Sequence, residues 1–161
     1  MFDERTVAEY LRRSYLAADG LWFMKVEERL DFDAALELDV EVWRILAKIQ
    51  ARKARELLGI EGHTLADLVA ALELMFAAEQ YSYTVVSQQP HRVEVEFTDC
   101  PWIELLQKSG REHLAARVAD AICPTDLGAW AREFDPAISV RFPQRLCDGK
   151  AVCRLVLEMG Q

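Results

Sequence analysis

The sequence lacks a surplus of basic residues. Its 161 residues include 19 Lys and Arg against 27 Asp and Glu, which gives a formal net charge of −8 at pH 7. Binding to nucleic acid or to an anionic membrane surface requires basic side chains that neutralise phosphates. The charge balance therefore predicts that neither nucleic acid nor a membrane is a partner.

Several common functional motifs are also missing. The sequence contains no glycine-rich phosphate loop, no His-Glu-x-x-His and no Gly-x-Ser-x-Gly. These absences argue against the commonest nucleotide-binding, metalloprotease and serine-hydrolase classes. They leave open whether the protein is an enzyme.

Long apolar runs and a leader-like N-terminus are absent as well. No stretch approaches the ~20 apolar residues of a membrane helix, and residues 1–5 are charged where a signal peptide would have a basic and then an apolar region. We therefore expect a cytoplasmic protein. About half of the residues are apolar and no Pro/Gly/Ser-rich linker interrupts them, so we expect a single domain over residues 1–161.

The first half of the sequence, residues 1–80, has the periodicity of helices. Apolar residues recur at helical spacing over residues 4–18, 33–58 and 64–79. Asp3 and Thr64 are expected to cap two of these helices, while Gly20 and Gly59 are expected to end two. The stripe predicted to face the core on the 33–58 helix is Ala35, Leu38, Val42, Leu46, Ile49, Lys53 and Leu57, broadened by Trp43 and Ile45.

The second half, residues 81–161, combines alternating and helical patterns. Alternation on both sides of residues 88–91 predicts a hairpin, and strands are also expected near residues 138–142 and 152–158. Helices are expected at residues 101–108, 112–122 and 125–134. The sequence therefore predicts an α+β fold, in which N-terminal helices pack on an antiparallel sheet of about four strands.

Cysteine is scarce and confined to the last third of the sequence, at Cys100, Cys123, Cys147 and Cys153. Cys100 precedes a proline, which predicts a helix start whose unpaired amides would favour a thiolate. Asp148-Gly149 predicts a tight turn with Cys147 before it and Cys153 after it. Three interpretations stay open: inert packing thiols, ligands of zinc or another thiophilic metal, and a catalytic thiol with Cys100 as the candidate.

Scattered segments resemble known families. Residues 20–28 and 48–51, together with Leu38-Asp39 and Val42-Trp43, resemble an uncharacterised family of small prokaryotic cytosolic proteins. The cysteine series, with Phe134-Asp135-Pro136, resembles the same family and, more distantly, L-2-amino-thiazoline-4-carboxylic acid hydrolase-like proteins and the four-vinyl reductase domain. The resemblance implies a four-vinyl reductase-like fold.

The four-vinyl reductase resemblance also implies a zinc site. In such domains of phenol-sensing regulators, a cysteine, a Glu-x-x-Cys pair and a further cysteine bind zinc beneath an apolar ligand pocket. Cys123, Gln144-x-x-Cys147 and Cys153 resemble that series, but Gln144 stands in the place of the acidic ligand. Cys100 is the candidate to replace the missing ligand.

The main functional prediction is a domain that binds a small, largely apolar molecule between its helices and its sheet, near a cysteine-ligated metal. Trp22, Phe23, Trp43 and Tyr83 are the predicted pocket walls, because such sites are mostly apolar. One alternative is a hydrolase of small amide or thiazoline-like substrates that uses Cys100 or a metal-bound water. Another is a structural subunit of an oligomer, with a homodimer as the expected form.

Overall fold

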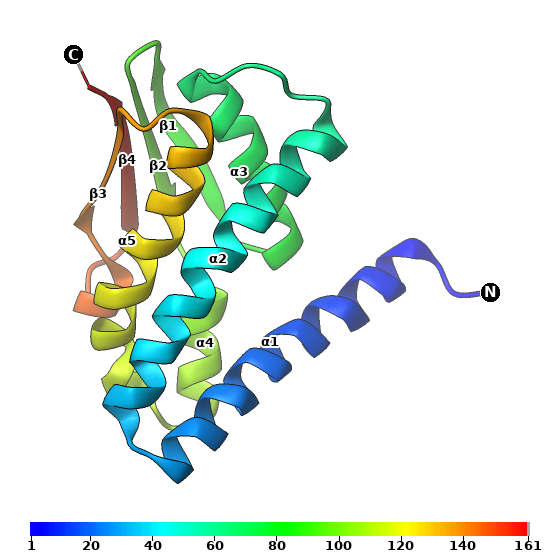
Figure 1. Ribbon diagram of the computed structural model, residues 1–161, viewed down its shortest axis with the longest axis vertical. Coiled ribbons are helices and arrows are strands. Elements are labelled where there is room, and N and C mark those ends of the chain that lie inside the picture. Colours follow the sequence, from blue (N-terminus) through cyan, green and yellow to red (C-terminus); the bar gives the residue numbers. More distant parts are fainter. Residues whose placement is uncertain (161) are drawn as a thin grey trace. The chain divides into compact units, whose positions relative to one another are not determined.

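The computed structural model describes residues 1–160, coloured from blue to red along the chain in Figure 1. The chain forms two compact units, residues 1–42 and the part that begins at Trp43, and the boundary between them lies within α2. The elements are α1 (Glu4–Arg29), α2 (Phe32–Leu58), α3 (Leu65–Glu79), β1 (Tyr83–Gln89), β2 (Arg92–Phe97), α4 (Pro101–Lys108), η1 (Glu112–Leu114), α5 (Ala115–Phe134), β3 (Ile138–Gln144), η2 (Leu146–Asp148) and β4 (Cys153–Met159).

Helix α1 begins where the sequence predicts and ends later. The backbone N–H of Thr6 donates to Asp3 Oδ1 at 2.6 Å, which confirms Asp3 as the N-cap. The predicted stop at Gly20 is wrong, because α1 continues to Arg29. A glycine inside a helix costs only about 1 kcal/mol relative to alanine, which neighbouring turns offset.

Helix α2 ends as predicted but buries a different face. Gly59 follows it with a φ of +64°, the left-handed conformation that stops a helix. Most of the predicted core stripe is wrong, because the exposed side chains include Leu38, Val42, Ile45, Ile49 and Leu57. Two predicted members, Ala35 and Trp43, are buried, and the rest of the buried face consists of Ala47, Ala51 and Ala54. Alanine side chains let a helix backbone approach its neighbours closely, so the small face packs into the core.

The four strands form one antiparallel sheet with the order β1-β2-β4-β3. The predicted hairpin is confirmed, with Tyr83 paired to Phe97 and Gln89 paired to Arg92. A capping box between Thr64 and Asp67 starts α3, also as predicted. The α+β fold with a four-stranded antiparallel sheet is therefore confirmed.

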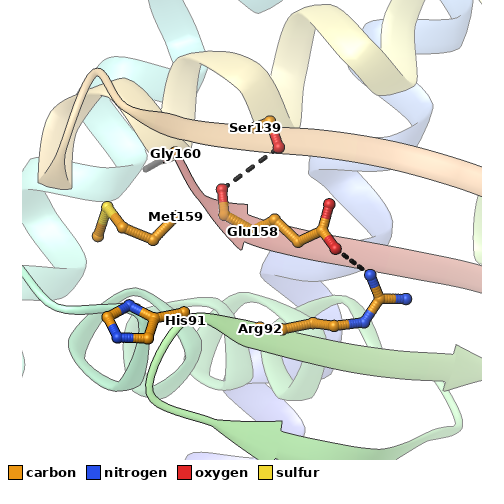
Figure 2. A pocket seen from close by; sticks show the side chains of 6 residues that line it. All are labelled: His91, Arg92, Ser139, Glu158, Met159 and Gly160. Carbon is orange, nitrogen blue, oxygen red and sulfur yellow. Dashed lines mark hydrogen bonds and ion pairs between the residues drawn. The ribbon is translucent and has the colours of Figure 1, made fainter.

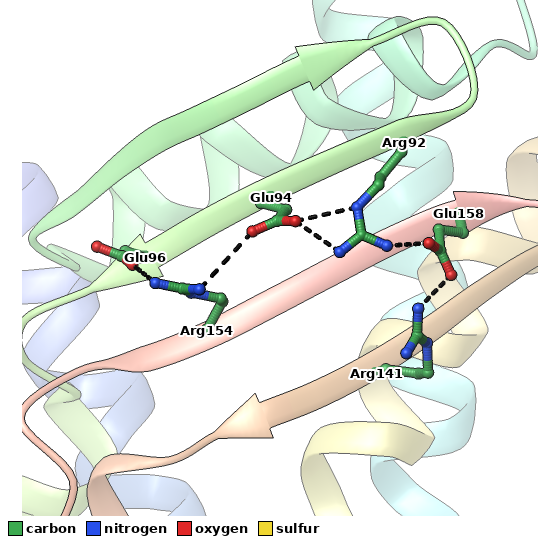
Figure 3. A network of polar contacts seen from close by, with 6 residues as sticks. All are labelled: Arg92, Glu94, Glu96, Arg141, Arg154 and Glu158. Carbon is green, nitrogen blue, oxygen red and sulfur yellow. Dashed lines mark hydrogen bonds and ion pairs between the residues drawn. The ribbon is translucent and has the colours of Figure 1, made fainter.

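The two faces of the sheet differ in chemistry. The inner face carries Val93, Val95 and Phe97 of β2 and Leu155 and Leu157 of β4. These side chains join residues of α2, α3 and α5 in the main core. The outer face carries the chain of ion pairs in Figure 3, formed by Arg92, Glu94, Glu96, Arg141, Arg154 and Glu158. Helices thus cover one face of the sheet, and the other face is polar.

Two predictions in the last third of the chain are wrong in detail. The expected break between residues 122 and 125 does not occur, because α5 continues through Pro124. Burial of Leu127, Trp130 and Phe134 on the same helix offsets the ~3 kcal/mol cost of an internal proline. The Asp148-Gly149 turn is also longer than predicted, since residues 145–152 connect β3 to β4 and include η2.

Candidate functional site

The candidate site lies in the unit that begins at Trp43, where α3 meets β1. Gln80 adopts a left-handed conformation at the end of α3, with a φ of 64°. The chain then turns sharply, and the N–H of Tyr81 donates to the Phe76 carbonyl at 2.9 Å. Asp99 holds the next residue, because its Oδ1 accepts from the N–H of Ser82 at 2.8 Å. This turn brings Tyr81 close to the start of α4.

Four aromatic rings pack around this turn. Phe76 contacts Phe97 with ring centroids 4.9 Å apart and an interplanar angle of 85°, and it contacts Tyr83 at 5.0 Å. Tyr81 lies 5.9 Å from Phe76 and 5.5 Å from Phe97. Edge-to-face pairs at these distances are favourable beyond the burial of their area. We call Phe76, Tyr81, Tyr83 and Phe97 the aromatic cluster.

One face of α5 brings polar atoms into the same core. Cys123, Asp126 and Trp130 are three and four residues apart, so they share one face of the helix. Among the described residues, neither the buried Oδ1 of Asp126 nor the buried Nε1 of Trp130 has a hydrogen-bond partner. Trp130 is only 1% exposed. Buried polar atoms nearly always have partners, so this pair is unusual.

The electrostatics connect α5 to the aromatic cluster. Burial, with a smaller contribution from the charge of Glu79, raises the pKa of Asp126 to about 8. The pKa of Tyr81 also lies well above its ordinary value, through burial first and then through the charges of Cys100, Glu79, Cys123 and Asp126. Coulombic interaction is stronger in a buried region of low dielectric than in water. Phe97 and Trp130 belong to one core cluster and Tyr81 packs against it, so this part of α5 lies in the same buried region as the aromatic cluster.

Glu79 borders this region at the end of α3. It is 6% exposed, and its Oε2 accepts a hydrogen bond of 3.0 Å from the indole Nε1 of Trp102 in α4. The ring of Trp102 packs against Trp43 in an edge-to-face pair, with centroids 5.2 Å apart. Trp43 thus helps to hold the indole that binds Glu79, and Glu79 in turn disfavours the ionised form of Asp126.

The four cysteines are free thiols, and each is partly buried. Cys100 forms the start of α4 before Pro101, as predicted. The expected thiolate is not favoured there, because burial raises the pKa of Cys100 despite opposing backbone N–H groups of Ile103 and Trp102. Burial likewise raises the pKa of Cys123 and of Cys147, and it raises that of Cys153 to about 11. Protonated thiols are poor nucleophiles and poor metal ligands.

The predicted metal site concerns the same four thiols. Within residues 1–160, no group of three or more His, Cys, Asp or Glu side chains is placed to hold one. Cys153 packs against the core from β4, as its alternation predicts, while Cys147 lies in η2. The thiols contribute to raising one another's pKa, and zinc at these cysteines stays a prediction.

The four predicted pocket walls have different environments. Trp43 and Tyr83 belong to the core-forming unit, where Trp43 is 4% exposed and Tyr83 is half-buried in the aromatic cluster. Trp22 and Phe23 lie on α1 in the N-terminal unit. Trp22 is 69% exposed, and Phe23 packs on Phe32 with ring centroids 5.7 Å apart. Only Trp43 and Tyr83 therefore belong to the same unit as Asp126.

A surface pocket of about 660 Å³ lies at the other end of the sheet, as Figure 2 shows. Its charged groups already pair with each other, because Arg92 binds Glu158, and the hydroxyl of Ser139 donates to the backbone carbonyl of Glu158 at 3.3 Å. His91, Met159 and Gly160 also line the pocket. The core region around Asp126, which contains polar atoms without partners, is the stronger candidate for a binding site.

Comparison with known proteins places the chain in a family. Residues 5–149 match the model described as "Family of unknown function (DUF6125)". The chain belongs to this family. No curated protein matches it. The expectation of an uncharacterised family is thereby confirmed, whereas the relation to four-vinyl reductase domains and thiazoline hydrolases stays a prediction.

Solved structures share the fold of this DUF6125 chain at low sequence identity. The phenol-responsive sensory domain of the transcription activator PoxR, solved with phenol, matches at a TM-score of 0.55 and 11% identity, over 89% of this chain and 73% of that chain. A trafficking protein particle complex subunit 3 from Naegleria fowleri, covalently bound to palmitic acid, matches at a TM-score of 0.59 and 9% identity, over 98% of both chains. These matches establish similarity of fold.

The helices of the DUF6125 chain were also compared with the requirements of a bilayer. Among residues 1–160, no helix has both the length and the apolar character needed to cross a membrane.

Sequence analysis missed three residues of the candidate site: Tyr81, Asp126 and Trp130. A usable signal was present at Asp126, because a carboxylate stands between Cys123 and Trp130 on the apolar face of a helix. A charged residue in such a position is rarely buried without a reason. The predicted break between residues 122 and 125 hid this signal, because it placed Cys123 outside the helix that contains Asp126.

Proposed function

We propose that this protein binds a small, largely apolar molecule between its helices and its sheet, beside the aromatic cluster. The proposal rests on one observation: apolar rings and unpaired polar atoms lie in the same buried region. The aromatic cluster supplies apolar walls, and Asp126 and Trp130 supply a few polar atoms. A mostly apolar site with a small number of placed polar groups is the usual composition of a small-molecule pocket.

The surroundings of this region favour access from outside. Tyr81, Cys100, Cys123, Asp126 and Cys153 each retain part of their surface exposed, although the polar ends of Tyr81 and Asp126 are buried. The proteins that share the fold hold phenol in one case and palmitic acid in the other. Both molecules are largely apolar, which supports the same class of ligand for this chain.

Titration with cyclohexane derivatives tests the proposal. Binding of cyclohexanol and methylcyclohexane should be detectable by calorimetry or by quenching of tryptophan fluorescence. Tyr83→Leu should weaken both probes alike, by up to about tenfold, because it removes one aromatic wall. Ile49→Ala, at a position that is 57% exposed, is the matched control and should change neither affinity. Failure of both probes to bind would contradict the proposed function.

The proposed function is argued without zinc, because no group of three or more metal-ligating side chains is found within residues 1–160. The sequence-based prediction of zinc at Cys100, Cys123, Cys147 and Cys153 can be tested separately. Elemental analysis of protein purified without chelators should find stoichiometric zinc if the prediction holds. Thermal melts with and without a strong chelator should then differ for the wild type and coincide for Cys153→Ser.

We also propose that the exposed stripe of α2 pairs with a second copy of the chain. Leu38, Val42, Ile45 and Ile49 are spaced by four, three and four residues, which is the repeat of a helix that packs along another helix. All four side chains are between 46% and 57% exposed. An identical stripe on a second copy is self-complementary, which is the requirement of a two-fold dimer. Sedimentation as a dimer would support this proposal.

A further inference from the structure

The unpaired polar atoms on α5 restrict the ligand chemistry. The indole Nε1 of Trp130 is a donor only, so the group that faces it must contain an acceptor. Oδ1 of Asp126 lacks a partner among residues 1–160 as well, so a ligand group that also contains a donor can form a second hydrogen bond there. The two side chains are one helical turn apart on one face, which makes a shared partner geometrically reasonable.

The charge and the hydrogen-bonding groups around Asp126 and Trp130 narrow the chemical class of the ligand. A carboxylate ligand offers no donor and would meet the negative charge of Glu79, which already disfavours ionisation of Asp126. An ammonium group offers no acceptor to Trp130. A hydrocarbon would leave both atoms unpaired. An ether could accept from Trp130, but it could pair with Asp126 only while that carboxyl group keeps its proton, below a pKa of about 8. A neutral hydroxyl group can pair with both side chains in either protonation state of Asp126.

We propose that Asp126 and Trp130 form an anchor for the hydroxyl group of an otherwise apolar alcohol or phenol. The hydroxyl donates its hydrogen to Asp126 Oδ1, and its oxygen accepts from the Nε1–H of Trp130. The carbon skeleton lies against the aromatic cluster. This inference rests on the proposed function and specifies the class of molecule that the site selects.

The test compares four probes of similar size: cyclohexanol, methylcyclohexane, cyclohexylamine and cyclohexanecarboxylate. Wild-type protein should bind cyclohexanol about tenfold more tightly than methylcyclohexane, the factor expected for one to two net hydrogen bonds. The amine and the carboxylate should bind more weakly than the alcohol. Asp126→Leu should bring the alcohol and the hydrocarbon within about twofold of each other, because it removes the acceptor and keeps an apolar surface.

Three further variants separate an anchor from a general effect on packing. Asp126→Asn retains an acceptor oxygen and should keep most of the preference for the alcohol. Asp120→Asn changes an exposed carboxylate of the same helix, one that pairs with Arg145, and should leave all four affinities unchanged. Trp130→Phe removes only the donor and part of the ring, and should weaken the alcohol more than the hydrocarbon.

The outcomes distinguish failure of the hydroxyl anchor from failure of the apolar binding site. If the wild type binds the alcohol and the hydrocarbon equally, or if Asp126→Leu keeps the preference, the anchor is wrong and the apolar site stands. If none of the four probes binds the wild type, the proposed function fails and the anchor fails with it. A crystal structure with cyclohexanol that shows only a water molecule on Asp126 and Trp130 would also overturn the anchor.

Discussion

Helices α2 and α5 contribute to the same core with opposite chemistry. The buried face of α2 beyond Trp43 is made of Ala47, Ala51 and Ala54, whose side chains contain no polar atom. The buried face of α5 contains large apolar side chains together with two polar atoms, Oδ1 of Asp126 and Nε1 of Trp130. Neither atom has a hydrogen-bond partner in the part of the chain that the structure describes. One helix packs closely and the other leaves hydrogen-bonding capacity unused.

This difference indicates that α2 mainly packs the core, whereas α5 contributes to the candidate binding site. An unsatisfied buried polar atom costs about 1–3 kcal/mol, and a sequence selected for stability alone would remove it. Local rules that are broken without a structural benefit are expected where a protein binds or reacts. We therefore expect changes on α2 to affect stability, and changes at Asp126 to affect binding and pH dependence.

The largest effect on stability is expected for Trp43→Ala on α2. Trp43 is 4% exposed and packs edge-to-face on Trp102. Deleting a buried aromatic side chain should lower the free energy of unfolding by about 3–5 kcal/mol, which urea titration measures. Leu57→Ala, at an exposed position of the same helix outside the proposed dimer stripe, is the control and should cost less than about 1 kcal/mol. Equal losses for both variants would show that the two faces of α2 do not differ.

A smaller loss is expected when the alanine face is overfilled. Ala51 is fully buried, and Ala51→Leu inserts three additional carbon atoms into a packed core. The free energy of unfolding should fall by about 1–3 kcal/mol because neighbouring side chains must move. Ile49→Leu on the exposed face is nearly isosteric and should be neutral. An Ala51→Leu variant as stable as the wild type would indicate unfilled space beside α2.

On α5 we expect a substitution that raises the free energy of unfolding, in contrast to the losses expected on α2. Asp126→Leu removes a buried carboxyl oxygen, Oδ1, that has no partner among residues 1–160, and should raise the free energy of unfolding at pH 7 by about 1–3 kcal/mol. The pKa of Asp126 in the folded protein is about 8, above the ordinary value of ~3.9 that it has when unfolded. The folded protein therefore binds a proton that the unfolded chain has released between these values.

Measurements at several pH values test whether protonation of Asp126 contributes to stability. The contribution of Asp126 to stability is fully present below a pH of about 4 and is lost as the pH rises towards 8. Urea titrations of the wild type at pH 5 and pH 8 should accordingly show lower stability at pH 8, and Asp126→Leu should reduce this difference. A difference of the same size in both proteins would mean that other groups cause it.

The sequence predicted the general architecture because much of it is locally determined. Caps such as Asp3, the left-handed Gly59 and the alternation of β1 and β2 depend on neighbours in the chain. The α2 stripe was predicted wrongly because both of its faces are apolar, and periodicity alone cannot tell which one is buried. Pro124 was predicted to break α5 because the packing of Trp130 was not visible in the sequence.

The candidate site was predictable only in part. Tyr83 and Trp43 were identified as apolar wall candidates, since large aromatics are common in pockets. Asp126 was missed, because its importance depends on burial and on the lack of a partner, which are tertiary properties. The four cysteines were predicted as candidate metal ligands or as a catalytic thiol. Their spacing in sequence did not predict how burial would raise the pKa of each thiol.

The smallest effect on the folded monomer is expected on the exposed face of α2. Ile49→Glu should change the free energy of unfolding of a monomer by no more than about 0.5 kcal/mol, because the side chain is 57% exposed. If the stripe pairs with a second copy, the same change places like charges at the interface and should shift the dimer to monomer in sedimentation velocity. Leu57→Glu introduces the same charge at a 69% exposed position of α2 outside the stripe. It should leave the dimer intact, and dissociation by both variants alike would point to net charge rather than to the stripe as the cause.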